Sequence, residues 1–310
     1  DSVPVRIANN EVNFTNSDPT SAAVLMCYPA RNVLFAHNTV KASGTAAQSL
    51  WIDTSLNGNV TLANNIIQNE TNGPAMRVDD KETLDKIDMR GCNLYANSGK
   101  AAVVGDTWYD MSHWENAINA QNCFYKKVEF LDKWMLEPAE LGNLNKTSQV
   151  EGIDKDLTGM PRSSTPTIGA YEWCDYDKAP HAYDDFVEVK NITAHSADIM
   201  VTPSQSGTMW AVVLRAGEAQ PDAEAVMARG AKENVMRNKN SMVTVDGLAA
   251  GHSYVAYVVL KNLKGGVSDL IASMPFTIGQ DGDGIAHFEA DDGRQKEKLF
   301  TVDGKPAVGN

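Results

Sequence analysis

Two short segments carry the side chains with the most evident chemistry: Trp51 and Asp53 in "LWIDT", and Arg77 and Asp79 in "MRVDD". In each segment one position separates the two residues, so a β-strand would place both side chains on the same face. An exposed tryptophan can stack on a sugar ring, paired carboxylates can hold Ca²⁺, and an arginine can bind an anion. These four residues form one candidate site if the two segments lie side by side.

A recurring phrase predicts how such segments are arranged. Three copies align without gaps and two weaker ones follow: "VRIANNEV" (5–12), "VLFAHNTV" (33–40), "VTLANNII" (60–67), "IDMRGCNLY" (87–95) and "INAQNCFY" (118–125). Alignment on the last asparagine gives a column at intervals of 27 to 29 residues: Asn10, Asn38, Asn65, Asn93 and Asn122. Each copy has an inward-facing apolar pair before its turn, such as Val60 and Leu62. In the last two copies this pair lies one residue further from the aligned asparagine, and an extra residue in the turn would explain the shift.

A second column lies between the asparagines, where "AVLMCY", "SLWIDT", "PAMRVD" and "AAVVGD" superpose at steps of 26 residues. Alternate positions are all apolar, as the inner face of a strand must be: Val24, Met26, Leu50, Ile52, Met76, Val78, Ala102 and Val104. The positions between them point outward, and neighbouring strands lie about 4.8 Å apart. Trp51, Asp53, Arg77 and Asp79 are therefore expected to form one compact outward patch.

A period of this length, with three short strands and no helical pattern, predicts a solenoid of stacked parallel strands. Asparagines stacked at one turn can hydrogen-bond along the stack and satisfy amides that a buried bend would leave unpaired. The predicted fold class is all-β: about five coils of a parallel β-helix over residues 1–176, followed by an antiparallel β-sandwich over 181–278.

The pattern "LWIDTSLNGNVTLANNIIQN" resembles the right-handed parallel β-helix proteins, the fold of pectate lyases and related polysaccharide-acting enzymes with an internal asparagine ladder. The segment "DLTGMPRSSTPTIGAYEW" (156–173) resembles the closing motif of many bacterial members. The resemblance covers about residues 5–174. Because members usually have eight or more coils and a cap over the first, we expect this chain to be the C-terminal part of a longer protein.

The resemblance implies that the outward sheet and its loops hold a substrate groove. It favours a secreted or bacterial cell-surface protein with lyase-type activity on an acidic, uronate-containing polysaccharide. Asp53 and Asp79 would hold Ca²⁺, and Arg77 would remove the proton next to the uronate carboxylate or stabilise the enolate. The second role is easier, because a guanidinium is hard to deprotonate. Inserts at 81–86 and 106–117 would wall the groove, and three tryptophans would bind substrate there: Trp51, Trp108 and Trp114.

Several alternatives stay open. Arg77 can simply pair with Asp53 or Asp79 across adjacent strands, a common pattern on exposed sheets. For the whole protein, the alternatives to a lyase are a non-catalytic glycan-binding or adhesive surface protein and a structural stalk. In the lyase hypothesis, the catalytic coils could also lie partly upstream of this chain. His37 in "FAHNTV" lies in the turn column and is expected to be a turn residue rather than a base.

The second half of the chain contains alternating strands separated by turns, at 197–203, 208–215, 241–248 and 253–262. "GLAAGHSYVAYVVL" resembles the corner of fibronectin type III and related sandwiches, with Tyr254 as the corner residue and Trp210 as a core tryptophan. "DAEAVMARGAKENVM" is expected to form a short helix. Residues 279–310 form a tail with a possible hairpin, and "DGDG" at 281–284 lacks most ligands of a calcium loop.

Composition excludes several classes of function. The net charge of −13 argues against nucleic-acid binding, and no run approaches the roughly 18 apolar residues that span a bilayer. The four cysteines lack CxxC spacing, so we expect no zinc site and mostly buried thiols, with a disulfide as the alternative. The expected partner is an acidic polysaccharide, and the expected oligomeric state is a monomer.

Overall fold

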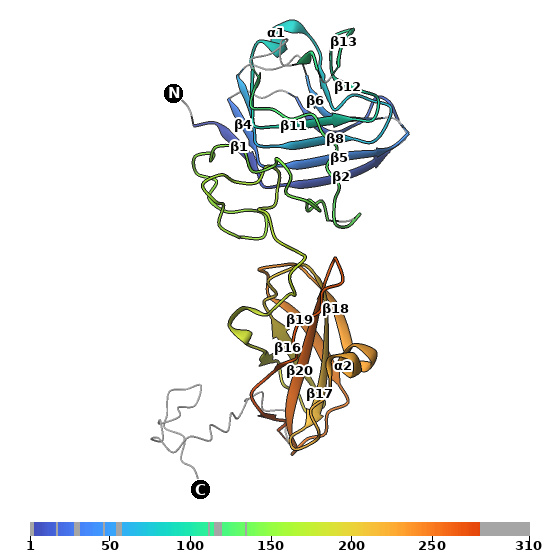
Figure 1. Ribbon diagram of the computed structural model, residues 1–310, viewed down its shortest axis with the longest axis vertical. Coiled ribbons are helices and arrows are strands. Elements are labelled where there is room, and N and C mark those ends of the chain that lie inside the picture. Colours follow the sequence, from blue (N-terminus) through green and yellow to red (C-terminus); the bar gives the residue numbers. More distant parts are fainter. Residues whose placement is uncertain are drawn as a thin grey trace.

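The computed structural model describes residues 3–16, 18–27, 32–45, 47–53, 58–110, 112–114, 120–133 and 135–279. A parallel β-solenoid forms the N-terminal part, and a pair of antiparallel sheets forms the C-terminal part (Figure 1). A long segment with little regular structure, green to yellow in Figure 1, joins them. The predicted all-β fold class is confirmed.

Three parallel sheets make up the solenoid, and each coil adds one strand to each sheet. The first sheet contains β1 (Val5–Ala8), β4 (Val33–Ala36), β7 (Val60–Ala63), β10 (Ile87–Arg90) and β14 (Ala120–Gln121). The second contains β2 (Glu11–Asn16), β5 (Thr39–Gly44), β8 (Ile66–Asn69) and β11 (Asn93–Ala96). The third contains β3 (Ala22–Met26), β6 (Gln48–Ile52), β9 (Met76–Val78) and β12 (Lys100–Val104), followed by the antiparallel β13 (Thr107–Asp110). The described strands thus form four complete coils and the first strand of a fifth.

The predicted register of the third sheet is confirmed. Leu50 pairs with Met76, and Ile52 pairs with Val78, on neighbouring coils. All four side chains are fully buried in the solenoid core. The core forms because alternate residues of each short strand point inward, and each coil covers the apolar residues of the next.

Two columns of turn residues separate the first sheet from the second. Residues of the first column have a positive φ between 52° and 61°: Asn9, His37, Asn64, Gly91 and Asn122. The next residue along the chain forms a hydrogen-bonded ladder. The backbone nitrogen of Asn38 donates to Asn65 Oδ1 at 2.9 Å, and that of Asn10 donates to Asn38 Oδ1 at 3.0 Å. Asn65 contacts Cys92 Sγ at 3.5 Å, so a cysteine continues the ladder.

The prediction of an extra turn residue in the last two copies of the phrase is wrong. Ile87 pairs directly with Val60, so no extra residue enters that turn. Asn93 lies one position after the ladder, as the first residue of β11. Asn122 lies one position before it, in the positive-φ column. Asparagine suits both positions, because it tolerates left-handed geometry and also bonds the local backbone. The register of the strands in the first sheet follows the inward-facing apolar residues before each turn, such as Ile87 and Met89, and not the asparagine.

The closing motif packs onto the turn columns of the solenoid. The Arg162 guanidinium is buried and donates to the carbonyls of Thr167 and Gly169 and to Asn9 Oδ1. Gly169 has a φ of +83°, and a Cβ there would lie 2.6 Å from Thr39 Oγ1. Only glycine allows this close approach without strain. The motif thus anchors the long connecting segment to the solenoid.

The C-terminal part is a sandwich of two antiparallel sheets around one core. One sheet contains β15 (Glu188–Lys190), β16 (Ser196–Val201) and β19 (Ser241–Asp246). The other contains β18 (Ala231–Val235), β17 (Gly207–Arg215), β20 (Ser253–Asn262), β21 (Ile271–Ala272) and β22 (Phe276–Thr277). Three short helices complete the described structure: α1 (Lys81–Leu84), the 3₁₀ helix η2 (Tyr183–Asp185) and α2 (Ala223–Arg229).

Two predictions for single residues of the sandwich have different outcomes. The hydroxyl of Tyr254 accepts a hydrogen bond from the Ala249 backbone nitrogen at 2.8 Å, so Tyr254 is a corner residue as expected. The prediction that Trp210 fills the sandwich core is wrong. Strand alternation directs its neighbours Met209 and Ala211 into the core, whereas Trp210 packs in a separate cluster that includes residues of α2.

The remaining predictions for this half concern the helix and the tail. The expected helix forms over α2, but the second half of that segment becomes strand β18. The tail beyond residue 279, with its "DGDG" segment, lies outside the described residues. In the described ranges, no helix has the length and apolar character needed to cross a membrane.

Candidate functional site on the third sheet

The outer face of the third sheet carries one row of side chains that crosses all its strands. The row follows the strand register through β3, β6, β9, β12 and the antiparallel β13: Leu25, Trp51, Arg77, Val103 and Trp108. Leu25 and Trp108 lie at its two ends and are 51% and 46% exposed. The row therefore presents aromatic, cationic and apolar groups along the direction in which the coils stack.

Asp79 organises the centre of this row. Trp51 Nε1 donates a hydrogen bond to Asp79 Oδ1 at 2.7 Å, and Arg77 Nε lies 3.3 Å from the same oxygen. The Arg77 guanidinium lies 4.7 Å from the centroid of the Trp51 ring, a cation–π distance. The Arg77 and Asp79 side chains are 37% and 20% exposed, so solvent screens this ion pair. The three side chains hold one another in place at the surface.

A cavity of about 440 Å³ adjoins this assembly. Arg77 and Trp108 line it, together with the polar side chains of Gln48, Asn72 and Asp106. The ammonium group of Lys100 lies 3.8 Å from the centroid of the Trp108 ring. The cavity thus combines an exposed aromatic ring with two nearby cations and several hydrogen-bonding groups. Such a lining suits a polar ligand that has both a flat apolar face and negative charge.

The structure brings Trp51, Arg77, Asp79 and Trp108 onto one face, but it separates Trp114 from them. Trp114 is 0% exposed and belongs to the solenoid core, where its ring meets Tyr109 edge-on at a centroid distance of 5.6 Å. A ring in this position is withdrawn from the surface. Trp114 is therefore left out of the candidate site, although the sequence placed it in the groove wall.

The two carboxylates of the predicted Ca²⁺ site, Asp53 and Asp79, lie on neighbouring coils, and Asp79 already has partners. Asp53 and Asp79 directly follow the paired residues Ile52 and Val78, so they occupy equivalent positions on neighbouring coils. One oxygen of Asp79 already accepts from an indole and a guanidinium. A cation bound there would compete with both donors. In the described part of the chain, no three His, Cys, Asp or Glu side chains are grouped closely enough to hold a metal.

His37 has the surroundings of a structural residue. It lies in the positive-φ turn column, is 0% exposed, and its Nε2 lies 3.1 Å from Asn64 Nδ2. Burial, together with the charge of Arg162, lowers the pKa of His37 to about 3. The imidazole is therefore neutral at physiological pH, and its position agrees with the expectation of a turn residue.

Sequence reasoning missed the contributions of Lys100 and Gln48 to this site, and it included Asp106 only as part of the insert 106–117. The dipeptide Gly105–Asp106 lies between β12 and β13 and is a hairpin signal. Recognising the hairpin would have placed Trp108 opposite Val103, at the end of the outward row. Gln48 gave no comparable signal. It is the first residue of β6, and the alternation of the strand does not predict on which face that position lies.

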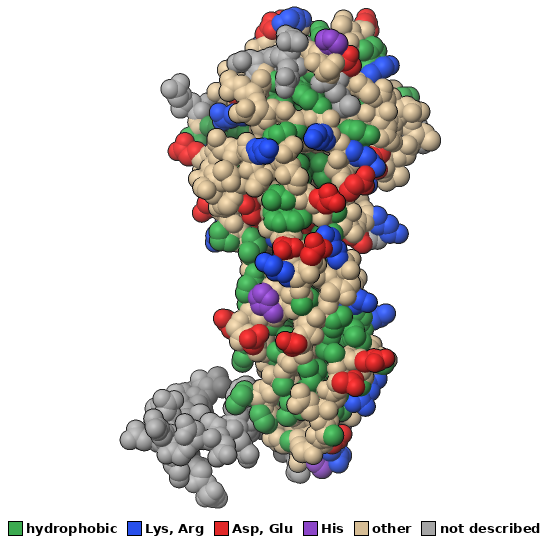
Figure 2. All heavy atoms as spheres, in the orientation of Figure 1, with side chains coloured by type: hydrophobic (Ala, Val, Ile, Leu, Met, Phe, Trp, Pro, Cys, Tyr) green, Lys and Arg blue, Asp and Glu red, His purple; other side chains and the backbone are tan. Residues whose placement is uncertain are grey.

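The fold and this face define a parallel β-solenoid protein with aromatic and cationic side chains beside a cavity on one outer sheet. On the face drawn in Figure 2, basic and acidic side chains are interspersed rather than gathered into one basic patch. Comparison of the chain with protein-family models, curated proteins and solved structures found no match.

Proposed function

We propose that this protein binds an acidic glycan, a polysaccharide that carries carboxylates, on the outer face of the third sheet. The observation that carries the proposal is the assembly of Trp51, Arg77 and Asp79 beside a cavity that Trp108 also lines. The resemblance to polysaccharide-acting β-helix proteins supports a location outside the cell or on a bacterial surface. The resemblance of the sandwich to fibronectin type III domains fits such a setting.

Each part of the groove has a matching part in the ligand. Asp79 engages Arg77 through Nε, and a guanidinium has two further nitrogens that donate in a fork suited to a carboxylate. The half-exposed ring of Trp108 offers an apolar face to a sugar ring. Lys100 lies over the Trp108 ring and adds positive charge there. Because the row runs across the coils, a polymer chain can contact several strands at once.

Binding fits this geometry better than catalysis by Arg77. Cleavage of lyase type needs a base that removes a proton from the sugar. The carboxylate of Asp79 stabilises the charged guanidinium, so Arg77 is suited to hold an anion and poorly suited to accept a proton. Lyase-type cleavage with Ca²⁺ at Asp53 and Asp79 is the second candidate, supported by the equivalent positions of the two carboxylates on neighbouring coils.

Binding to polygalacturonate and to neutral dextran, measured by isothermal titration calorimetry at moderate salt, tests the proposal. Wild type is expected to bind polygalacturonate only. Arg77→Ala is expected to weaken binding about tenfold or more, since hydrogen bonds to charged groups contribute about 1.5–3 kcal/mol. Trp108→Ala should also weaken binding. Arg90→Ala is the matched control, because it removes an exposed arginine from the first sheet.

Equal affinities for the two polymers, or equal effects of Arg77→Ala and Arg90→Ala, would contradict the proposed site. The second candidate is tested with the same polymer by adding Ca²⁺ and following the absorbance of unsaturated uronides. Product release that stops in Asp53→Asn would favour the lyase.

A further inference from the structure

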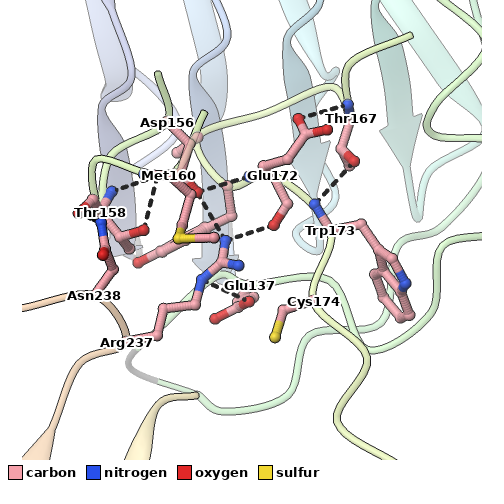
Figure 3. Close-up of polar contacts among 12 residues, drawn as sticks. Glu137, Asp156, Thr158, Met160, Thr167, Glu172, Trp173, Cys174, Arg237 and Asn238 are labelled. Carbon is pink, nitrogen blue, oxygen red and sulfur yellow. Dashed lines mark hydrogen bonds and ion pairs between the residues drawn. The ribbon is translucent and has the colours of Figure 1, made fainter. Parts of the chain in front are cut away.

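A single arginine of the sandwich enters a buried pocket in the segment that connects the solenoid to the sandwich, between β14 and η2 (Figure 3). This segment, which includes the closing motif, is called the closing segment below. Arg237 Nη2 donates to Asp156 Oδ2 at 2.7 Å and to the carbonyl oxygen of Glu172. Its Nε lies 3.2 Å from Glu137 Oε1. The side chains of Arg237, Glu137 and Asp156 are 1%, 2% and 0% exposed. One guanidinium therefore joins the two halves of the protein without contact with solvent.

Neighbouring groups extend this junction into a continuous network. Asn238 Nδ2 donates to the Thr158 carbonyl at 3.0 Å, again from the sandwich to the closing segment. The Tyr176 hydroxyl donates to Glu137 Oε2 at 2.8 Å and accepts from the Ser206 backbone nitrogen at 3.1 Å. The sandwich is thus fixed to the closing segment by several hydrogen bonds rather than tethered by a linker.

The charges in and around this pocket do not balance if every group is ionised. Four carboxyls and two guanidiniums are linked through direct contacts and through Tyr171: Glu11, Glu137, Asp156, Glu172, Arg162 and Arg237. The carboxyls exceed the guanidiniums by two, so full ionisation would leave an excess of negative charge in a region of low dielectric. An uncompensated buried charge is costly, and such a group takes up a proton instead.

Hydrogen bonding identifies where a proton is best held. Asp156 accepts from the backbone nitrogens of Thr158, Met160 and Glu172, from the Thr158 hydroxyl and from Arg237. These five donors satisfy it as an anion. Glu137 has one hydrogen-bond donor, the Tyr176 hydroxyl, and an ion pair with Arg237. Burial raises the pKa of Glu137 to about 7 against the opposing effect of Arg237.

We propose that this junction is a proton-dependent latch, in which Glu137 takes up a proton when the sandwich docks on the solenoid. When the halves separate, Glu137 becomes exposed and its pKa returns toward the ordinary value of 4.5. The docked state then binds more protons, so docking is strongest below about pH 4.5 and weakens as the pH rises toward 7. This latch is independent of the proposed glycan groove.

The other groups around Glu137 whose pKa values are shifted do not oppose this direction. Burial also raises the pKa of Glu11, but its hydrogen-bond partners Tyr171 and Leu136 lie on the solenoid side of the junction, so its protonation is not coupled directly to docking. Burial raises the pKa values of Cys174, Tyr171 and Tyr176 above ranges that are already alkaline. They release no proton below pH 7, and Arg162 and Arg237 stay charged there. Glu137, which contacts Arg237 of the sandwich, therefore sets the pH dependence of the latch.

Hydrogen–deuterium exchange of the 310-residue chain between pH 5 and pH 7 tests the latch. After correction for intrinsic exchange, the opening equilibrium of peptides 172–178 and 203–207 should rise with pH by up to roughly tenfold per unit for each proton released. Peptides covering β7 in the solenoid core should show no such rise. Glu137→Gln, which is always neutral, should reduce the slope of the junction peptides.

Glu129→Gln is the matched control, because Glu129 lies on the same segment but is 71% exposed, and it should keep the wild-type slope. A corrected opening equilibrium in wild type that does not change with pH would overturn the proposal. So would an unchanged slope in Glu137→Gln. The wild-type measurement decides on its own if Glu137→Gln fails to fold.

Discussion

Two arginines of this protein make the same kinds of contact in opposite surroundings. Arg77 pairs with Asp79 at 3.3 Å and lies 4.7 Å from the ring of Trp51. Arg237 pairs with Asp156 at 2.7 Å and lies 5.8 Å from the ring of Tyr171. The first arginine side chain is 37% exposed and the second is 1% exposed.

This difference in burial separates the proposed binding surface from a structural joint. At the surface, the ion pair contributes little to folding, and water reaches the guanidinium, so a ligand can replace that water. In the buried pocket, each charged group depends on its partners, because loss of one partner leaves an uncompensated charge. The same set of side chains can thus serve recognition at one place and assembly at another.

The largest expected effect is that of Arg237→Ala. Removing this guanidinium leaves Glu137 and Asp156 buried without their cation, and breaking a buried pair costs about 3–5 kcal/mol. Urea denaturation at pH 7, followed by tryptophan fluorescence, should show this loss or a separate early transition for the sandwich. Arg237→Lys keeps the charge and should recover part of the loss. A loss below about 1 kcal/mol would show that the junction tolerates an empty pocket.

Arg77→Ala should have a much smaller effect on folding. Exposed ion pairs contribute about 0.2–1 kcal/mol, so the midpoint of urea denaturation should change little. The same variant is expected to lose most of its affinity for polygalacturonate. A stability loss comparable to that of Arg237→Ala would contradict the comparison, because it would make Arg77 a structural residue. Arg90→Ala again serves as the control for loss of one positive charge.

The sequence allowed the surface group to be predicted because its residues obey a period. Strand alternation placed Arg77 and Asp79 outward, and the 26-residue step placed Trp51 beside them. The junction offered no such signal. Arg237 lies 81 positions from Asp156, in a polar loop between strands that resembles any exposed turn. Contacts of this kind depend on how the two halves dock, and no local sequence pattern predicts that docking.

Two other differences between the prediction and the structure have local physical causes. Cys92 occupies the asparagine ladder because a thiol can accept the same bonds, so residue identity alone misplaced Asn93. Trp114 was placed in the groove wall because its insert is rich in aromatic residues. In the structure its ring is enclosed in the solenoid core. Aromatic residues in an insert can therefore fill the core as well as line a groove.

Asp79→Asn should have the smallest effect on folding. The amide oxygen can still accept from Trp51 Nε1, so only the charge of the exposed pair is lost, and the expected change is within about 0.5 kcal/mol. The effect on ligand binding is more informative. Removing a negative charge beside Arg77 makes the groove more positive, so affinity for polygalacturonate should rise a few-fold at low salt and less at high salt.

The sign of this change separates the two candidate functions. If Arg77 captures the ligand directly, Asp79→Asn strengthens binding whether or not Ca²⁺ is present. If Asp53 and Asp79 hold a bridging Ca²⁺, the same substitution removes a ligand of the cation, and Ca²⁺-dependent binding and cleavage both fall. Calorimetry of the Asp79→Asn variant, once with Ca²⁺ and once with chelator, distinguishes direct capture by Arg77 from binding through Ca²⁺. Weaker binding by Asp79→Asn in the presence of chelator would contradict the expected gain in affinity, and it would show that Asp79 positions Arg77 mainly through its charge.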